Sequence, residues 1–379
     1  MDLTFSADEQ VFRAEARAWL EANVPADPLP SGDTAEGFAA HLDWERRLYD
    51  ERWVAVSWPE EYGGRGATLW EWLIFEEEYW RAGAPNRVNQ NGLFLLAPSI
   101  FAFGTDEQKA RFLPGIASSE YLFCQGWSEP NAGSDLAGIT SRAVRDDTAA
   151  GWRLTGQKTW TTRGAFCNWL FGLFRSDPEA ERHRGLTYFL VPLDADGVTV
   201  RPVGRLDGDD GFAEVFLEDV LVTDDLVLGE VDGGWKVAMS TTSSERGLSL
   251  RSPGRFLAAA GSLADLYRDR RSEADPGLRD AVVRAWMDAD AYRLHTFRTV
   301  TRMTDGDALG AEASFMKLFW SELDVSLHEA ALGLLGVDAE LDIDGWMKGY
   351  QFSLAGPIYA GTNEIQRNVV AERVLGLPR

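Results

Sequence analysis

The feature of this sequence that most restricts its fold is a change of pattern near residue 120, reversed between residues 228 and 234. Apolar residues follow helical spacing up to about residue 120. Residues 121–228 instead contain short β-rich runs separated by Gly and Pro, and long helical patterns return from Gly234 onward. We therefore predict an α+β fold with an N-terminal helical domain at 1–120, a middle β domain at 121–228 and a C-terminal helical domain at 229–379.

Local signals support this division. The segment Ser6–Glu9 has the spacing of a capping box, and a later helix is expected to begin near Thr68. Thr105, followed by two acidic residues, predicts another helix start, and Pro114-Gly115 is expected to follow its end. The β runs of the middle segment are predicted at 152–154, 186–191, 198–200 and 213–217.

Composition excludes several classes of protein. The net charge of −23 argues against binding a nucleic acid, because phosphate recognition needs clustered Lys and Arg. No apolar run approaches the roughly 18 residues of a membrane-spanning helix, and the first residues do not have the pattern of a signal peptide. Cys124 and Cys167 are the only cysteines, so a disulfide framework is not expected and a cytoplasmic location is predicted.

The four histidines are far apart in the sequence and lack metal-ligand spacing, so no metal site is expected. They are interpreted as surface residues or as structural residues with satisfied hydrogen bonds. No Walker loop, no Cys-x-x-Cys pair and no Gly-x-Ser-x-Gly elbow occurs. These observations leave other kinds of cofactor and substrate site to be considered.

Three segments carry the clearest functional pattern: Gln125–Asp135, Gly156–Thr162 and Tyr359–Arg367. In this order they resemble the flavin-binding and C-terminal signatures of the acyl-CoA dehydrogenases. The resemblance extends over nearly the whole chain and implies FAD as cofactor. It also implies that the C-terminal domain is a four-helix bundle.

The resemblance assigns FAD contacts to residues in all three segments. Small residues at Gly133 and Ser134 let backbone N–H groups and a hydroxyl approach the pyrophosphate. Trp160 would pack on the flavin face, and Ser128 and Thr162 would lie near the isoalloxazine ring. The complete set of expected FAD contacts is Gln125, Trp127, Ser128, Gly133, Ser134, Trp160, Thr162, Thr362 and Glu364, with Arg271 lent to a neighbouring subunit. Thr362 is also expected to cap the final helix, which Ile365, Val369 and Val374 would dock.

The C-terminal segment departs from the commonest family pattern at one position. That pattern places a glutamate before the Gly-Thr pair to remove the substrate α-proton, whereas this chain has Ala360. One branch of the family carries its base on another helix, directly before an arginine. Glu245, eleven residues after Gly234 and directly before Arg246, has the spacing of that alternative base. Glu245 is therefore the predicted base; expected substrate contacts are Ser134, Arg246, Tyr359, Ala360 and Gly361.

The part of the FAD site that a homotetrameric relative lends to its neighbour is altered here. The register from Glu245 keeps its arginine at Arg271, but the expected Phe and Gly are Ala274 and Asp275. Two expected glutamines are Val282 and Ala330. We therefore expect pairing with a related but different subunit in an α2β2-type assembly, a dimer of dimers. A homo-oligomer with altered FAD contacts is the alternative.

The resemblance implies α,β-dehydrogenation of an acyl thioester, with the β-hydride passing to flavin N5 and electrons passing on to an electron-transferring flavoprotein. Such an enzyme would act in fatty acid or lipid metabolism. Coenzyme A and an acyl-carrier protein both stay open as carriers of the acyl group. Two alternatives use the same fold: a flavin monooxygenase or oxidase, and a non-catalytic partner subunit. The register of Glu245 disfavours the first, and the intact flavin signature disfavours the second.

Overall fold

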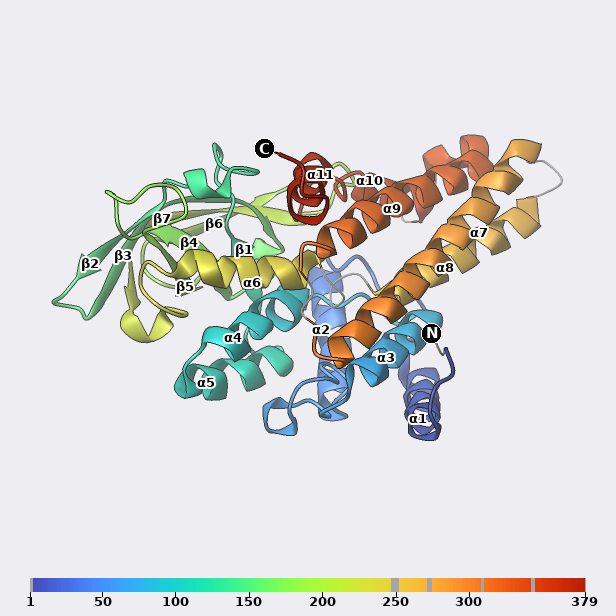
Figure 1. Cartoon of the computed structure of the whole chain (residues 1–379), viewed down its shortest axis with the longest axis horizontal. Helices are drawn as coiled ribbons and strands as arrows, with labels where there is room; N and C mark the ends of the chain where they lie inside the picture. The colour runs from blue at the N-terminus through green and yellow to red at the C-terminus, as the bar shows by residue number, and fades with distance from the viewer. Residues whose placement is uncertain (1–2, 247–251, 271–274, 308–309, 342–344, 379) are drawn as a thin grey trace. The chain divides into compact units, whose positions relative to one another are not determined.

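The computed structural model describes residues 3–246, 252–270, 275–307, 310–341 and 345–378, and only the backbone of 243–246. The chain divides into two compact units, and both are discontinuous in sequence. The first unit contains Met1–Ala26, Ala67–Ala84 and Arg246–Arg379; the second contains Asp27–Gly66 and Pro85–Glu245. Because the N-terminal helices are shared between the units, the boundaries at 120 and 228 stay a prediction. The predicted α+β class is confirmed: along the sequence, a region rich in strands lies between two helical regions, as the colours of Figure 1 show.

The second unit is built around one mixed β sheet. Among the described residues the sheet has seven strands in the order β1-β4-β2-β3-β7-β6, and β5 pairs with β4. β1 runs parallel to β4, whereas β3 is antiparallel to both β2 and β7. The strands are β1 (Phe123–Gly126), β2 (Arg142–Asp146), β3 (Gly151–Thr162), β4 (Trp169–Arg175), β5 (Leu186–Pro192), β6 (Val198–Val203) and β7 (Phe212–Thr223).

The predicted β runs are confirmed as parts of β3, β5, β6 and β7. β4 was missed because its residues do not alternate. Its sequence WLFGLFR is buried along almost its whole length, so neither face shows the polar residues that reveal a half-buried strand. Leu170, Phe171, Leu173 and Phe174 are fully buried and form part of the core of this unit.

Of the helices in the second unit, α5 begins at the residue that the sequence indicates. The helices are α2 (Ala35–Asp50), α4 (Ala97–Phe103), α5 (Asp106–Ala117) and α6 (Gly234–Arg246). Thr105 and Gln108 form a reciprocal capping box at the start of α5. The prediction that Pro114 follows the end of α5 is wrong, because the helix continues through Pro114 to Ala117. The proline removes one helical hydrogen bond, the one that its own N–H would donate to the carbonyl oxygen of Ala110, and the helix ends three residues later.

The first unit is a helical assembly drawn from both ends of the sequence (Figure 1). α7, α8 and α9 pack against one another, α3 packs on α7, and α1 packs on α3. At Gly254 of α7, a Cβ atom would lie 2.7 Å from the carbonyl oxygen of Glu76 in α3, so the two backbones approach closely. The helices are α1 (Ala7–Asn23), α3 (Leu69–Arg81), α7 (Pro253–Arg270), α8 (Pro276–Thr304), α9 (Ala313–Leu335), α10 (Trp346–Ser353) and α11 (Asn363–Val369).

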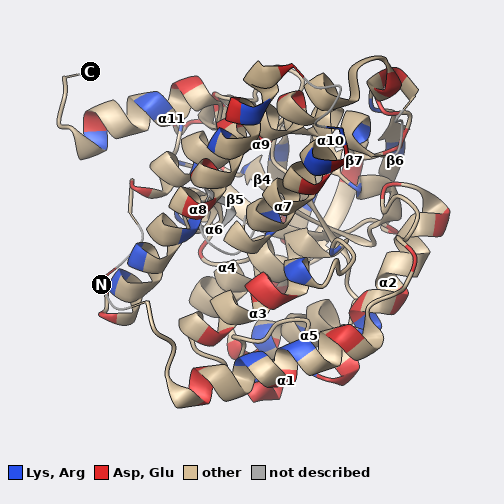
Figure 2. Ribbon diagram, turned by 90° about the vertical axis from the view of Figure 1, so that its right-hand side faces the viewer, with Lys and Arg blue, Asp and Glu red and all other residues tan. Residues whose placement is uncertain are grey.

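The predicted capping box of α1 and the predicted helix start near Thr68 are both confirmed. Ser6 and Glu9 form a capping box on α1, and Thr68 and Glu71 form another on α3. Acidic and basic positions are interspersed along α1, as the red and blue bands in Figure 2 show. Within the described residues, no helix combines the length and the apolar character needed to cross a membrane.

Helix α11 contacts α9 through polar residues that the predicted apolar stripe does not include. Asn363 is 4% exposed and Gln366 is fully buried, whereas Val374 is 37% exposed. The amide oxygen of Asn363 accepts hydrogen bonds from Lys317 Nζ at 2.6 Å and from Ser321 Oγ at 3.1 Å, both on α9. Of the predicted stripe, Ile365 and Val369 are half-buried, and the prediction is wrong for Val374. Helical periodicity does not reveal the hydrogen bonds between α11 and α9.

Candidate active site

The predicted flavin-binding segment begins at the end of strand β1. Gln125 is the third residue of β1, and Trp127 follows the strand as a buried side chain. The Trp127 ring meets Tyr188 of β5 edge to face, with 6.4 Å between the ring centroids. Its indole N–H is buried and has no hydrogen-bond partner among the described residues. A buried N–H group without a partner is costly, so this donor is suited to an acceptor on a bound molecule.

A buried ion pair connects this segment to strand β3. Lys158 Nζ lies 2.8 Å from Glu129 Oε1 and also donates to the carbonyl oxygen of Leu173 at 2.8 Å. The other Glu129 oxygen accepts from the backbone N–H and the hydroxyl of Thr140. Next to the pair, the backbone N–H of Thr159 donates to the carbonyl oxygen of Ser128 at 2.9 Å. The two predicted flavin-binding segments are thus joined directly.

The pair is ionised at neutral pH. Burial raises the pKa of the Glu129 carboxyl, but the charge of Lys158 and hydrogen bonds from Lys158, Ser141 and Thr140 outweigh it and lower the pKa to about 2. Burial lowers the pKa of Lys158 to about 8, against the opposite effect of Glu129. The sequence contains a clue to this ion pair, because Glu129 and Lys158 are charged residues within the two motifs. A lysine that is buried in a strand needs a partner of opposite charge.

Trp160 projects from an irregularity in strand β3. The pairing of β3 with β7 shifts between Lys158 and Thr161, and Trp160 there has φ 57°, in the left-handed region. Its side chain is 62% exposed and meets Phe212 edge to face. A bulge re-aims a side chain that regular pairing would place elsewhere. The strand therefore presents a large flat aromatic surface at its end.

The residues present in this unit fit an FAD molecule. Gly133 and Ser134 are exposed, and a Cβ atom on Gly133 would meet nothing within 4 Å, so the backbone there is open to close approach. Trp160 offers a face on which a ring system can stack. Trp127 offers its unpaired N–H, and Thr162, at the end of β3, is half-buried.

The C-terminal segment forms a tight turn before helix α11. Ala360 has φ 59° and Gly361 has φ 81°, so two consecutive residues are left-handed. Gln366 Nε2 donates to both of their carbonyl oxygens, at 3.0 and 3.2 Å. Thr362 caps α11 by accepting from the backbone N–H of Ile365, as predicted. The half-buried ring of Tyr359 lies 5.9 Å from that of Trp320.

Glu364, the last predicted FAD contact, is exposed in the first turn of α11. Hydrogen bonds with its own backbone N–H and with Thr362 lower the pKa of its carboxyl. The carboxylate is therefore ionised at neutral pH and available at the surface of the unit. Its role toward FAD stays a prediction.

Three predicted residues cannot be assigned a geometry. Glu245 and Arg246 are the last residues of α6, but their side chains lie outside the described part of the chain, and Arg271 lies outside it altogether. Of the altered interface positions, Asp275 caps α8 by accepting from Gly277 N at 2.7 Å. Val282 and Ala330, at the two positions where glutamines were expected, are each 6% exposed.

Comparison with known proteins identifies the class to which this fold and these motifs belong. Models of the N-terminal, middle and C-terminal domains of acyl-CoA dehydrogenases match residues 6–120, 124–220 and 232–375. These three matches follow one another along almost the entire chain. They define a flavoprotein dehydrogenase of the acyl-CoA dehydrogenase class.

Individual relatives agree over the full length. The chain is 40% identical over 389 residues to acyl-CoA dehydrogenase IpdE1 of Mycolicibacterium smegmatis, covering 98% of each protein. Among solved structures, the Tcur3481-Tcur3483 steroid ACAD matches with a TM-score of 0.88 at 29% identity, covering all of both chains. The ChsE4-ChsE5 complex from Mycobacterium tuberculosis matches with a TM-score of 0.84 at 29% identity, also over both complete chains. This chain belongs to the acyl-CoA dehydrogenase family, and is thus an oxidoreductase.

Proposed function

We propose that this chain catalyses the FAD-dependent α,β-dehydrogenation of an acyl-CoA with a bulky polycyclic acyl group, using Glu245 as the base. Family membership supports acyl-CoA dehydrogenation in general. The finer assignments rest on the residues of this chain. The observation that carries them is Ala360, whose methyl group occupies the position at which the commonest family pattern has its catalytic carboxylate.

FAD, when bound, accepts the β-hydride of the substrate at N5. The chain's own residues would hold it through Gly133 and Ser134 at the pyrophosphate and through Trp160 at the ring face. Trp127 would donate its unpaired indole N–H to an acceptor on the bound molecule. The Lys158–Glu129 pair would keep these residues in register, because it ties the two segments that carry them.

Glu245 would remove the α-proton. Its place at the end of α6, eleven residues after Gly234 and directly before Arg246, matches the pattern of the branch with the displaced base. A carboxylate that loses water around it on substrate binding gains basicity, because burial raises its pKa toward the working pH. The backbone N–H of Ala360 would donate to the thioester carbonyl, a contact that requires no side chain.

The acyl group is proposed to be steroid-derived. A methyl group at position 360 takes up less room than a glutamate side chain, which favours a bulky group over a straight chain. The solved relative with a TM-score of 0.88 is a steroid ACAD. Coenzyme A is the proposed carrier of the acyl group, since the curated relatives are acyl-CoA dehydrogenases. An acyl-carrier protein is the alternative carrier, and the assay should include it.

We also propose that the chain works in a heteromer with a related subunit and passes electrons to an electron-transferring flavoprotein. Asp275, Val282 and Ala330 have replaced residues that homotetrameric relatives lend to a neighbour's FAD site, whereas the motifs that hold this chain's own FAD are intact. Two solved relatives are named as pairs, Tcur3481-Tcur3483 and ChsE4-ChsE5.

The base assignment is tested by anaerobic titration of the FAD-loaded protein with acyl-CoA thioesters. Wild type should bleach the flavin absorbance with a steroid side-chain thioester, and Glu245→Gln should bind the same thioester with bleaching slowed at least about 10³-fold, on the order expected for loss of a general base. Glu245→Asp, which keeps a shorter carboxylate, should retain part of the rate. Bleaching of Glu245→Gln at the wild-type rate would exclude Glu245 as the base.

Substrate class and assembly have separate tests. Straight, branched and polycyclic acyl-CoA thioesters are compared by kcat/KM, and a preference for straight medium chains would contradict the proposed acyl group.

Purified alone, the chain should hold less than one FAD per polypeptide, and this ratio should rise when a related partner subunit is co-expressed. Full FAD occupancy in a homomer would rule out the heteromer. Rapid oxygen consumption with bound substrate would instead favour an oxidase.

A further inference from the structure

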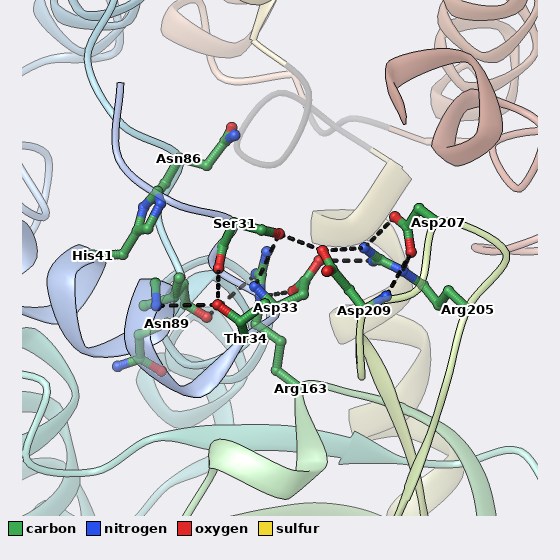
Figure 3. Close-up of polar contacts among 12 residues, drawn as sticks. Ser31, Asp33, Thr34, His41, Asn86, Asn89, Arg163, Arg205, Asp207 and Asp209 are labelled. Carbon is green, nitrogen blue, oxygen red and sulfur yellow. Dashed lines mark hydrogen bonds and ion pairs between the residues drawn. The ribbon is translucent and has the colours of Figure 1, made fainter. Parts of the chain in front are cut away.

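In the unit that contains the β sheet, Asp33 lies between two arginine side chains (Figure 3). Asp33 Oδ1 accepts from Arg163 Nε at 2.6 Å, and Asp33 Oδ2 lies 2.7 Å from Arg205 Nη1. The side chains are 10% exposed for Asp33 and 13% exposed for each arginine. One carboxylate therefore joins the segment before α2, the residue after β3 and the loop between β6 and β7.

A second set of contacts closes the cluster into a ring. The backbone N–H of Arg163 donates to the carbonyl oxygen of Gly211 at 3.0 Å. A Cβ atom on Gly211 would lie 2.4 Å from Arg205 Nη1, so the guanidinium of Arg205 rests directly against this glycine. Asp33, Arg163, Gly211 and Arg205 thus each contact the next, and Asp33 is the member that links both arginine side chains.

The loop between β6 and β7 holds Arg205 in this place. Arg205 Nη2 lies 2.7 Å from Asp207 Oδ2, and the backbone N–H of Arg205 donates to the carbonyl oxygen of Asp209 at 2.8 Å. Ser31 adds a hydrogen bond to Asp209 from the segment before α2 (Figure 3). Burial opposes the charge on Arg205, but Asp33 and Asp207 outweigh it and raise the pKa of the guanidinium.

The ring lies next to the segment that carries Trp160. Arg163 directly follows Thr162 and is itself left-handed, with φ 55°, as is Trp160 with φ 57°. A non-glycine residue pays about 1–2 kcal/mol in this region, so the surrounding contacts must hold it there. Lys158 and its partner Glu129 fix one side of the bulge, and Arg163 with its partner Asp33 fixes the other.

We propose that Asp33 is a positioning residue, which acts through Arg163 to hold Trp160 and Thr162 in the conformation that receives the flavin. The role of Trp160 and Thr162 toward the flavin rests on the proposed function. The effect of Asp33 on their conformation can be measured in the protein without cofactor. Asp33 lies in a segment before helix α2 and outside the family motifs quoted for FAD. Through Asp33, the segment before α2 would hold the conformation of the residues at the end of strand β3.

The test compares Asp33→Asn with Asp146→Asn. Asp146 Oδ2 accepts from Arg153 Nε at 3.0 Å near the opposite end of β3, so the control also removes a carboxylate partner from an arginine on or next to the same strand. Hydrogen exchange is measured by mass spectrometry on the flavin-free protein, in the peptide 158–166. Asp33→Asn should speed exchange there about tenfold, the equivalent of roughly 1.4 kcal/mol, and Asp146→Asn should leave it unchanged.

A second measurement uses the FAD-loaded protein in its native assembly. Asp33→Asn should raise the FAD dissociation constant about tenfold and shift the visible flavin absorption, and Asp33→Glu should restore part of both. Gly211→Ala, which displaces Arg205, should also speed exchange in 158–166 and raise the FAD dissociation constant. It replaces Asp33→Asn as the test variant if Asp33→Asn does not fold. If neither Asp33→Asn nor Gly211→Ala alters exchange in 158–166 more than Asp146→Asn does, the positioning role is wrong. That result would leave the proposed dehydrogenation unaffected.

Discussion

Lys158 Nζ and Glu129 Oε1 lie 2.8 Å apart, with 0% and 4% of their side chains exposed. The pair joins the loop after β1 to the strand that ends in Trp160, so two segments that are distant in sequence become one structural element. A buried charge is costly without its partner. The pair should therefore contribute to stability as a unit and only poorly as separate residues.

Removing both members of this pair should cost less stability than the sum of the two single removals. Lys158→Met leaves a buried carboxylate and should lower the free energy of unfolding by about 3–5 kcal/mol, as measured by urea denaturation of the flavin-free protein. Glu129→Gln is measured in the same way. The double variant Glu129→Gln/Lys158→Met should lose less free energy of unfolding than the two single variants together, by more than about 1 kcal/mol. Arg182→Ala breaks the exposed pair with Asp135 and should change stability by less than about 1 kcal/mol. Additive losses would show that the pair does not act as a unit.

The Glu129 carboxyl should also make stability depend on pH in acid. Its pKa is about 2 in the folded protein, below its ordinary value of 4.5. A lowered carboxyl pKa gives stability that is present above the unfolded value and is lost as pH falls toward the folded value. The difference in stability between wild type and Glu129→Gln should therefore be largest at about pH 5–7, where Lys158 is still protonated, and should shrink below about pH 4.5. A difference that grows on acidification would contradict the assignment.

Ala360 should be conformationally strained. A left-handed alanine costs about 1–2 kcal/mol, and a glycine avoids that cost while adding about 0.5–1 kcal/mol of chain entropy. Ala360→Gly should therefore raise the free energy of unfolding by about 0.5–1 kcal/mol. The matched change, Gly361→Ala at φ 81°, should lower it by about 1 kcal/mol. Equal effects of the two substitutions on the urea midpoint would show that backbone strain does not decide stability here.

Thr362 should stabilise the start of α11 through its hydroxyl. Thr362→Ala removes the acceptor for the Ile365 N–H and should cost about 1 kcal/mol, whereas Thr362→Ser should cost little. Thermal unfolding of the flavin-free variants measures both. If the alanine and serine variants unfold together, the cap does not contribute.

The sequence predicted what depends on local pattern. A capping box identified the start of α1, a turn before Thr68 indicated the start of α3, and acidic residues in the first turn indicated the start of α5, because each signal lies within a few residues of the helix end. Strand β4 was missed because burial on both faces removes the alternation on which strand prediction depends. The roles assigned to Glu245 and Arg271 came from resemblance and register alone, and they stay predictions.

Long-range polar pairs were not predictable in the same way. Asp33 and Arg163 are 130 residues apart, and nothing local to either residue indicates the other. The same holds for Asn363 and Lys317, which dock a helix that the sequence assigned to an apolar stripe. Lys158 and Glu129 are an intermediate case, since both lie within recognised motifs but their pairing follows only from how β3 is folded.

The discontinuity of the first unit has a consequence for the order of events during synthesis. α3 packs on α7, and these helices are separated in the chain by the whole β sheet. The face of α3 that packs on α7 therefore emerges from the ribosome long before that partner exists. The nascent chain must keep this surface from aggregating for about 170 residues of elongation, roughly 10–30 s at typical translation rates. Chaperone dependence is expected to end only when α7 has been made.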